Sequence, residues 1–171
     1  MAQTEPATNT RLKVSIERMT EHDLLEVVEI EKTCGLSPWG WDSYHRELSS
    51  GPHAVMLVAR IKDEQGVFVD ENKIAGFIVS RVIADELHIN NIAVRPECQK
   101  MGIGTRLLRA ALADGAGRRA LMAFLEVRAS NGPAQKLYER CGFRTAGRRK
   151  GYYRDPAEDA LIMSITLRSR P

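Results

Sequence analysis

A glycine-rich run in the middle of the chain, Gln99-Lys100-Met101-Gly102-Ile103-Gly104-Thr105, has the composition of a phosphate-binding loop. It lies between an apolar stretch, residues 89–94, and a helical pattern that begins near Gly102. Glycines let the backbone turn sharply and approach a ligand closely, and the first N–H groups of a helix have no intrahelical partner. The helix dipole adds partial positive charge at that end. The run therefore predicts a site for a phosphate-bearing small molecule.

The run matches neither of two common nucleotide motifs. A P-loop ends in Gly-Lys-Ser/Thr, which is absent here. A dinucleotide fingerprint needs Gly-x-Gly-x-x-Gly beside a first strand, whereas Gly102 and Gly104 are followed by Leu107 in mid-chain. From the run alone, a tight strand-to-helix turn with incidental glycines remains the alternative.

Two other residues in the same half of the chain could move protons. Glu126 ends an apolar stretch, and Tyr138 lies on the helical pattern that follows it. A carboxylate can accept a proton from an attacking amine, and a phenol with a pKa of about 10 is protonated at neutral pH and can donate one. Taken singly, such a glutamate more often pairs with a neighbour such as Arg128, and such a tyrosine more often packs in the core.

Apolar periodicity predicts the elements that hold these residues. In the first half we expect strands at 12–19, 54–61, 74–83 and 87–94, with helices at 20–32 and 41–48. In the second half we expect a helix at 102–116, a strand at 121–127, a helix from Asn131 to Gly142, and strands from Phe143 onward and at 160–167. Because residues 121–127 are almost wholly apolar, we expect that strand to be covered on both faces.

Composition limits the classes of protein. The 171 residues are 43% apolar, which suits one domain, and no apolar run approaches the roughly 20 residues of a membrane span. Residues 1–11 are polar and lack a signal-peptide core, so we expect a disordered leader, a domain at 12–168 and a cytoplasmic protein that contacts no membrane. The cysteines are odd in number and scattered, so we expect neither a disulfide framework nor a metal site.

Charge is unevenly distributed along the chain. Residues 1–94 hold 9 Lys/Arg and 15 Asp/Glu, whereas residues 95–171 hold 16 and 7. The basic half contains the glycine-rich run, where it would attract a ligand with several phosphates. Since no nucleic-acid motif accompanies the charge, we do not expect a nucleic-acid partner.

Three segments together resemble the RimI-like branch of the GNAT acetyltransferases, the ribosomal-protein-alanine N-acetyltransferases. Residues 91–96 read NIAVRP, residues 125–131 read LEVRASN, and residues 137–143 read LYERCGF. Pro38-Trp39, Gly151-Tyr152-Tyr153 and Glu158-Asp159-Ala160 also fit, so the resemblance covers residues 12–167. It implies an α/β (mixed α+β) fold with one mostly antiparallel sheet, splayed between its fourth and fifth strands and flanked by about four helices.

The resemblance also implies a cofactor, acetyl-CoA, lying in the splayed gap. Ile92, Ala93 and Val94 would line its acetyl and pantetheine arm, and Asn131 would form a hydrogen bond with that arm. The pyrophosphate would be held by the six residues Lys100, Met101, Gly102, Ile103, Gly104 and Thr105.

By the same resemblance, Glu126 would be the proton acceptor and Tyr138 the proton donor. Trp39, Tyr152 and Tyr153 would border a peptide slot, although ordinary packing at a rim is the alternative for these rings. The implied substrate is a protein N-terminus, namely the N-terminal alanine of small-subunit ribosomal protein number eighteen, and the enzyme would be a monomer or weak dimer.

Some features depart from the pattern and leave other functions open. Cys98, Lys100 and Met101 vary the usual filling of the loop, and residues 62–72 are additional. One alternative is a GNAT enzyme that acetylates lysine side chains or a small-molecule amine. Another is an acyl-CoA-binding sensor without catalysis, which would require neither Glu126 nor Tyr138.

Overall fold

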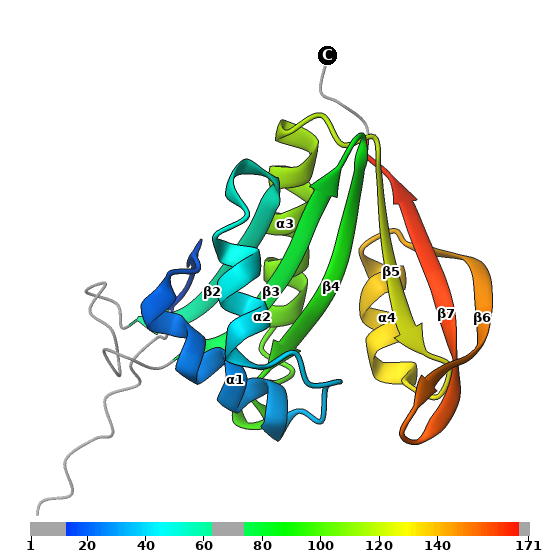
Figure 1. Cartoon of the computed structure of the whole chain (residues 1–171), viewed down its shortest axis with the longest axis horizontal. Coiled ribbons are helices and arrows are strands. Elements are labelled where there is room, and N and C mark those ends of the chain that lie inside the picture. Colours follow the sequence, from blue (N-terminus) through cyan, green and yellow to red (C-terminus); the bar gives the residue numbers. More distant parts are fainter. Residues whose placement is uncertain (1–12, 63–73, 168–171) are drawn as a thin grey trace, which may run out of the picture.

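The computed structural model describes residues 13–62 and 74–167 (Figure 1). The expected leader, 1–11, and nearly all of the additional segment, 62–72, lie outside the described residues. The elements in chain order are β1 (Lys13–Arg18), η1 (Glu21–Asp23), α1 (Leu24–Thr33), α2 (Gly40–Leu48), η2 (Gly51–His53), β2 (Ala54–Lys62), β3 (Ile74–Ile83), β4 (Glu86–Val94), η3 (Pro96–Cys98), α3 (Ile103–Gly117), β5 (Met122–Arg128), α4 (Gly132–Arg140), β6 (Arg144–Arg154) and β7 (Ala157–Thr166).

The seven strands form one sheet in the order β1-β2-β3-β4-β5-β7-β6. All neighbouring pairs are antiparallel except β4 and β5. That parallel pairing joins only residues 86–89 to residues 122–125, and beyond it the two strands diverge (Figure 1). The expected mixed sheet, splayed between its fourth and fifth strands, is confirmed.

Helices cover the two halves of the sheet differently. One core lies between α1, α2 and strands β2–β4 and includes Tyr44 and Phe77. The other lies on the opposite face, where α3 and α4 pack, and includes Leu107, Tyr138 and Met163. Figure 1 shows α1 and α2 over the first half only, with α4 next to β5. The second half of the sheet therefore has one face without a helix among the described residues.

A β-bulge in β4 coincides with the point where the sheet opens. Val79 pairs with Asn91 and Ser80 with Ile89, which leaves Asn90 as an extra residue in β4. Ile89 is also the last residue of β4 that pairs with β5. Because a bulge bends and twists its strand, this one accounts for the divergence of β4 from β5.

The expectation that β5 is covered on both faces is wrong. Ala123, Leu125 and Val127 are buried, but the alternate residues Phe124 and Glu126 are only half-buried. Helices α3 and α4 cover one face of this strand, while its other face borders the opening between β4 and β5. The side chains of β5 thus alternate between buried and half-buried positions, as in a strand that is covered on one side.

Gly76 in β3 allows the neighbouring strand β4, which borders the opening, to approach closely. A Cβ at this position would lie 2.6 Å from the Ala93 carbonyl oxygen and 3.1 Å from Val94 Cα. We expect Gly76→Ala to reduce the free energy of unfolding by about 2 kcal/mol or more, measured by urea denaturation. Gly147→Ala is the control, because its nearest neighbour would be Ile162 Cδ1 at 3.7 Å. Equal stability of the two variants would contradict this packing.

Candidate active site

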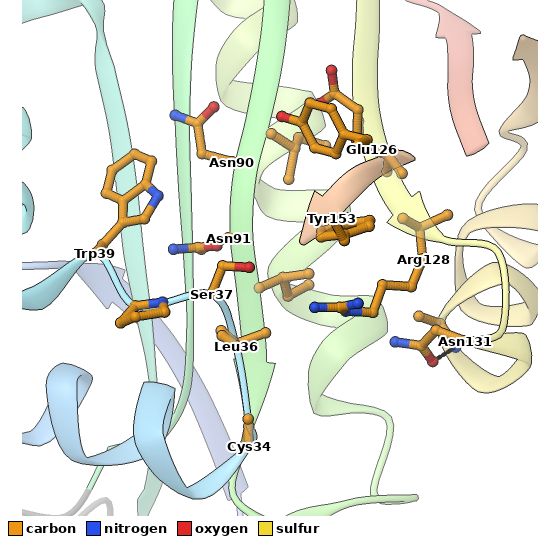
Figure 2. A pocket seen from close by; sticks show the side chains of 18 of the residues that line it. Cys34, Leu36, Ser37, Trp39, Asn90, Asn91, Glu126, Arg128, Asn131 and Tyr153 are labelled. Atoms are coloured by element: carbon orange, nitrogen blue, oxygen red, sulfur yellow. Dashed lines mark hydrogen bonds between the residues drawn. The ribbon is translucent and has the colours of Figure 1, made fainter. Parts of the chain in front are cut away.

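The opening between β4 and β5 contains a cavity of about 730 Å³ (Figure 2). One wall is formed by the segment between α1 and α2 together with β4, and the other by β5, α4 and the β6–β7 hairpin. The lining residues are Cys34, Gly35, Leu36, Ser37, Pro38, Trp39, Ile89, Asn90, Asn91, Ile92, Leu125, Glu126, Val127, Arg128, Asn131, Ala134, Tyr138, Tyr152, Tyr153, Arg154 and Asp155.

Glu126 lies in this cavity on β5, on the face that no described helix covers. Its Oε1 is 3.1 Å from Nη1 of Arg149, and 32% of its side chain is exposed. The pairing of Glu126 with Arg128, considered as an alternative, does not occur. Arg128 instead donates hydrogen bonds to the carbonyl oxygens of Asp155 and Pro156, and its Nη1 is 3.4 Å from Glu158. The Glu126 carboxylate therefore remains at the cavity surface.

Tyr138 reaches the same cavity from α4. Its side chain packs beside Phe143 and is only 6% exposed. Among the described residues its hydroxyl has no hydrogen-bond partner. Burial raises the pKa of Tyr138 well above the usual value for tyrosine, and neighbouring Tyr153 adds to the effect. The phenol is therefore held in its protonated form beside the cavity.

Asn131 precedes α4 and serves as its N-cap, as expected. Its Oδ1 accepts a hydrogen bond of 3.1 Å from the Ala134 backbone N–H, drawn as a dashed line in Figure 2. Because capping uses only the side-chain oxygen, the amide nitrogen remains available to a ligand. Asn131 lines the same cavity as Glu126 and Tyr138.

An irregularity in strand pairing positions the aromatic residues of the β6–β7 hairpin. The pairing of β6 with β7 is interrupted between Arg149 and Tyr153, and Gly151 there has a φ of +57°. The Gly151 N–H donates to Asp159 Oδ1 at 2.8 Å. The rings of Tyr152 and Tyr153 meet edge to face at 5.1 Å, and both line the cavity.

Trp39 forms part of the opposite wall, where a buried carboxylate fixes it. Glu31, only 1% exposed, accepts hydrogen bonds from the backbone N–H groups of Trp39 at 2.8 Å and Gly40 at 3.2 Å. Figure 2 shows Trp39 across the cavity from Tyr153. The three residues predicted for a peptide slot therefore lie around one cavity.

The glycine-rich run lies at the carboxyl end of β4 and does not line this cavity. Lys100 and Gly102 have φ values of +62° and +76°, and α3 begins at Ile103 without a side-chain cap. The first N–H groups of a helix of 15 residues are thus available to an anion. Gly104 also permits close packing, since a Cβ there would lie 3.3 Å from Leu137 of α4.

The other residues predicted to bind the cofactor fall into two groups. Ile92 lines the cavity with Asn131, whereas Ala93 is buried in the core beneath α1. Val94 ends β4, and its carbonyl oxygen accepts hydrogen bonds from Cys34 Sγ at 3.4 Å and Gln99 Nε2 at 3.1 Å. Met101, Ile103 and Thr105 belong to the glycine-rich run and its helix, outside the cavity.

Two cavity residues, Asn90 and Asn91, and one contact, between Arg149 and Glu126, depend on strand pairing and were not predicted from the sequence. Asn90 and Asn91 line the cavity because of the bulge in β4. Arg149 reaches Glu126 across β7, since Arg149 pairs with Ala160 and Glu126 with Ile162. The only available signals were the two consecutive asparagines and the basic run before Gly151, and neither specifies a partner.

Residues 13–62 and 74–167 contain no metal site and no membrane-spanning helix. No group of His, Cys, Asp and Glu there could hold a metal ion, and no disulfide joins the cysteines of these ranges. Within the same ranges no helix has the length and apolar character needed to span a membrane. His88 forms a hydrogen bond with Glu86 at 2.8 Å and stacks on Phe124, outside the residues that line the cavity.

The opened mixed sheet, with a carboxylate and a buried phenol at the opening, has the features of an acyl-transfer enzyme. The model of the acetyltransferase (GNAT) family matches residues 24–143, and the chain belongs to this family. A Bacillus subtilis (strain 168) protein, provisionally named a ribosomal protein bS18-alanine N-acetyltransferase, is 36% identical over 92% of this chain and 98% of its own length.

Two further relatives agree with this assignment. The N-alpha-acetyltransferase RimI of Mycobacterium tuberculosis (strain ATCC 25618 / H37Rv) is 35% identical over 95% of this chain and 94% of its own length. The crystal structure of the ribosomal-protein-S18-alanine N-acetyltransferase from Escherichia coli superposes with a TM-score of 0.78 and 30% identity. That comparison covers 93% of this chain and 97% of the other. The expected resemblance to RimI-like acetyltransferases is confirmed.

Proposed function

We propose that this chain transfers an acetyl group from acetyl-CoA to the α-amine of a protein N-terminus, with the N-terminal alanine of ribosomal protein bS18 as its substrate. The observation that carries the proposal is the presence of Glu126 and Tyr138 in one cavity where β4 and β5 part. The names of the Bacillus subtilis and Escherichia coli relatives support bS18 as the acceptor, and the name of the Mycobacterium tuberculosis relative supports an α-amine. The reaction would take place in the cytoplasm, where ribosomal proteins are made.

Acetyl-CoA would lie along the diverging edge of β4. Beyond Ile89 the strand no longer pairs with β5, so its backbone groups can bind the amides of the pantetheine arm. Ile92, Ala93, Val94 and Asn131 would contact that arm. The pyrophosphate would lie on the first N–H groups of α3, within the loop from Lys100 to Thr105.

Glu126 and Tyr138 would act at opposite ends of the transfer. An α-amine has a pKa of about 7.7–8.0, so a carboxylate needs to remove a proton from only part of the bound substrate at neutral pH. The neutral amine nitrogen then attacks the thioester carbon, the C–S bond breaks, and the departing thiolate takes a proton from Tyr138. The nitrogen loses its surplus proton as the amide forms, and that proton restores the Tyr138 phenol. Burial keeps Tyr138 protonated for this step because it raises its pKa.

Gly102 offers a test of the proposed pyrophosphate site. We expect Gly102→Ala to raise the KM for acetyl-CoA about tenfold, because a left-handed backbone is strained for alanine and the loop would shift its N–H groups. Gly51→Ala is a matched control, since Gly51 has the same φ of +76° and the same open surroundings. Both variants should lose similar stability in thermal melting. A KM unchanged in Gly102→Ala would argue against this loop as the site.

The acceptor can be identified by mass spectrometry of peptides incubated with the chain and acetyl-CoA. One peptide would begin with a free alanine in the bS18 sequence, and a second would have a blocked N-terminus and one internal lysine. We expect acetylation of the free N-terminus alone. Modification of the lysine peptide alone would refute the N-terminal assignment, and binding of acetyl-CoA without transfer to either would indicate a small-molecule acceptor or a sensor.

A further inference from the structure

A buried series of hydrogen bonds joins α1, α2 and β4 behind the cavity wall. The Tyr44 hydroxyl is 2.7 Å from Glu31 Oε1, and Asn91 Nδ2 is 3.0 Å from the Tyr44 oxygen. Glu31 and Tyr44 are almost fully buried, whereas Asn91 is half-buried and lines the cavity. The series therefore connects the core beneath α2 to a side chain at the site.

The direction of these hydrogen bonds follows from the donors around Glu31. Its carboxylate accepts hydrogen bonds from the backbone N–H groups of Trp39 and Gly40, and the Tyr44 hydroxyl donates to its Oε1. The single proton of the Tyr44 hydroxyl must therefore go to Glu31. Burial, together with Glu31, raises the pKa of Tyr44, which keeps that proton in place.

The orientation of the Asn91 amide follows in turn. Because the Tyr44 proton is used, its oxygen can only accept, and Asn91 must present Nδ2 to it. The Asn91 carbonyl oxygen then points away from Tyr44 and has no hydrogen-bond partner among the described residues. Figure 2 shows Asn91 between Trp39 and Tyr153, just past the bulge at Asn90. Glu31 and Tyr44 thus fix a hydrogen-bond acceptor in the cavity wall.

We propose that Asn91 Oδ1 accepts a hydrogen bond from the substrate's α-amino group, opposite Glu126, and that Tyr44 and Glu31 are positioning residues for this contact. The inference rests on the proposed function and adds a substrate-binding residue to it. An α-ammonium carries three N–H donors, and proton transfer to Glu126 uses only one. A fixed acceptor on the β4 side holds a second N–H, which aims the nitrogen lone pair at the thioester.

The test measures steady-state kinetics with the alanine-starting peptide. We expect Asn91→Leu to lower kcat/KM for the peptide about 10- to 100-fold, the effect of losing one hydrogen bond to a charged group. The KM for acetyl-CoA should stay within about twofold of the wild-type value, since β4 binds the cofactor through its backbone. Tyr44→Phe should lower the same kcat/KM by a smaller factor, because its ring still packs but Asn91 can rotate.

The double variant Tyr44→Phe/Asn91→Leu distinguishes positioning from general damage. If Tyr44 acts through Asn91, the double variant should have the same kcat/KM as Asn91→Leu alone. Glu47→Gln is the control for a general loss of stability around α2. Glu47 is 8% exposed and bound to Arg81 by two hydrogen bonds of 2.9 Å, but it does not line the cavity. We expect this variant to melt at a lower temperature with unchanged kinetic constants.

Three results would overturn the inference: wild-type kcat/KM in Asn91→Leu, additive losses in the double variant, or an equal loss in Glu47→Gln. Failure of the proposed function has a different signature. In that case the wild-type chain itself would acetylate no N-terminal peptide. The proposed role of Asn91 would then be refuted together with the proposed function.

Discussion

Glu126→Gln is expected to lower kcat/KM for the alanine-starting peptide about 100- to 1,000-fold at pH 7, the range typical of a lost general base. Glutamine has nearly the same size as glutamate but cannot take a proton from the substrate. The variant would also lose its ion pair with Arg149, which joins two partly exposed side chains and contributes little to stability. The loss should therefore appear in catalysis, with acetyl-CoA binding unchanged by isothermal titration calorimetry.

The pH dependence of Glu126→Gln provides a second readout. The neutral form of the substrate amine becomes dominant above its pKa of about 7.7–8.0, so less of the reaction then depends on a base. We expect the difference in kcat/KM between Glu126→Gln and the wild type to become smaller from pH 7 to pH 9. Asp114→Asn is the control. Asp114 lies on α3, forms an ion pair with Arg18 at 2.8 Å, and does not line the cavity. A Glu126→Gln rate equal to the wild-type rate would exclude Glu126 as the base.

Tyr138→Phe is expected to lower kcat about 100-fold, because the departing thiolate would lose its proton donor. The substitution removes one oxygen that has no hydrogen-bond partner among the described residues, and the ring can still pack beside Phe143. Thermal stability should therefore remain close to that of the wild type. The KM values for acetyl-CoA and peptide should change little, since the effect is confined to the chemical step.

The raised pKa of Tyr138 defines the pH range of this effect. A phenol is active as a donor below its pKa, and burial moves that pKa upward from about 10. Tyr138 should therefore stay protonated throughout pH 6–10, and the Tyr138→Phe loss should be constant over that interval. If the loss of kcat in Tyr138→Phe disappeared well below pH 10, Tyr138 would titrate in that range. This result would contradict the proposal that burial keeps Tyr138 protonated as the donor. An unchanged kcat would exclude the proton-donor role.

Much of the fold could be predicted because local patterns determine it. Strand alternation, the cap at Asn131, and the glycine run before α3 each depend on neighbouring residues, and the predicted elements fall within a few residues of those observed. The segments that resemble GNAT acetyltransferases also predicted the splayed sheet. The exception was β5, where an apolar run suggested cover on both faces although the helices cover only one.

The sequence by itself determined the family, the elements and the residues that could carry the chemistry. The tertiary structure alone decided how their side chains are paired. Glu126 contacts Arg149 because β5, β7 and β6 lie in a particular register, and Asn91 faces the cavity because β4 has an extra residue at Asn90. Shifting a strand by one residue turns its side chains to the opposite face. Register arises from contacts between segments that are distant in the sequence. Local sequence patterns therefore do not predict these side-chain pairings.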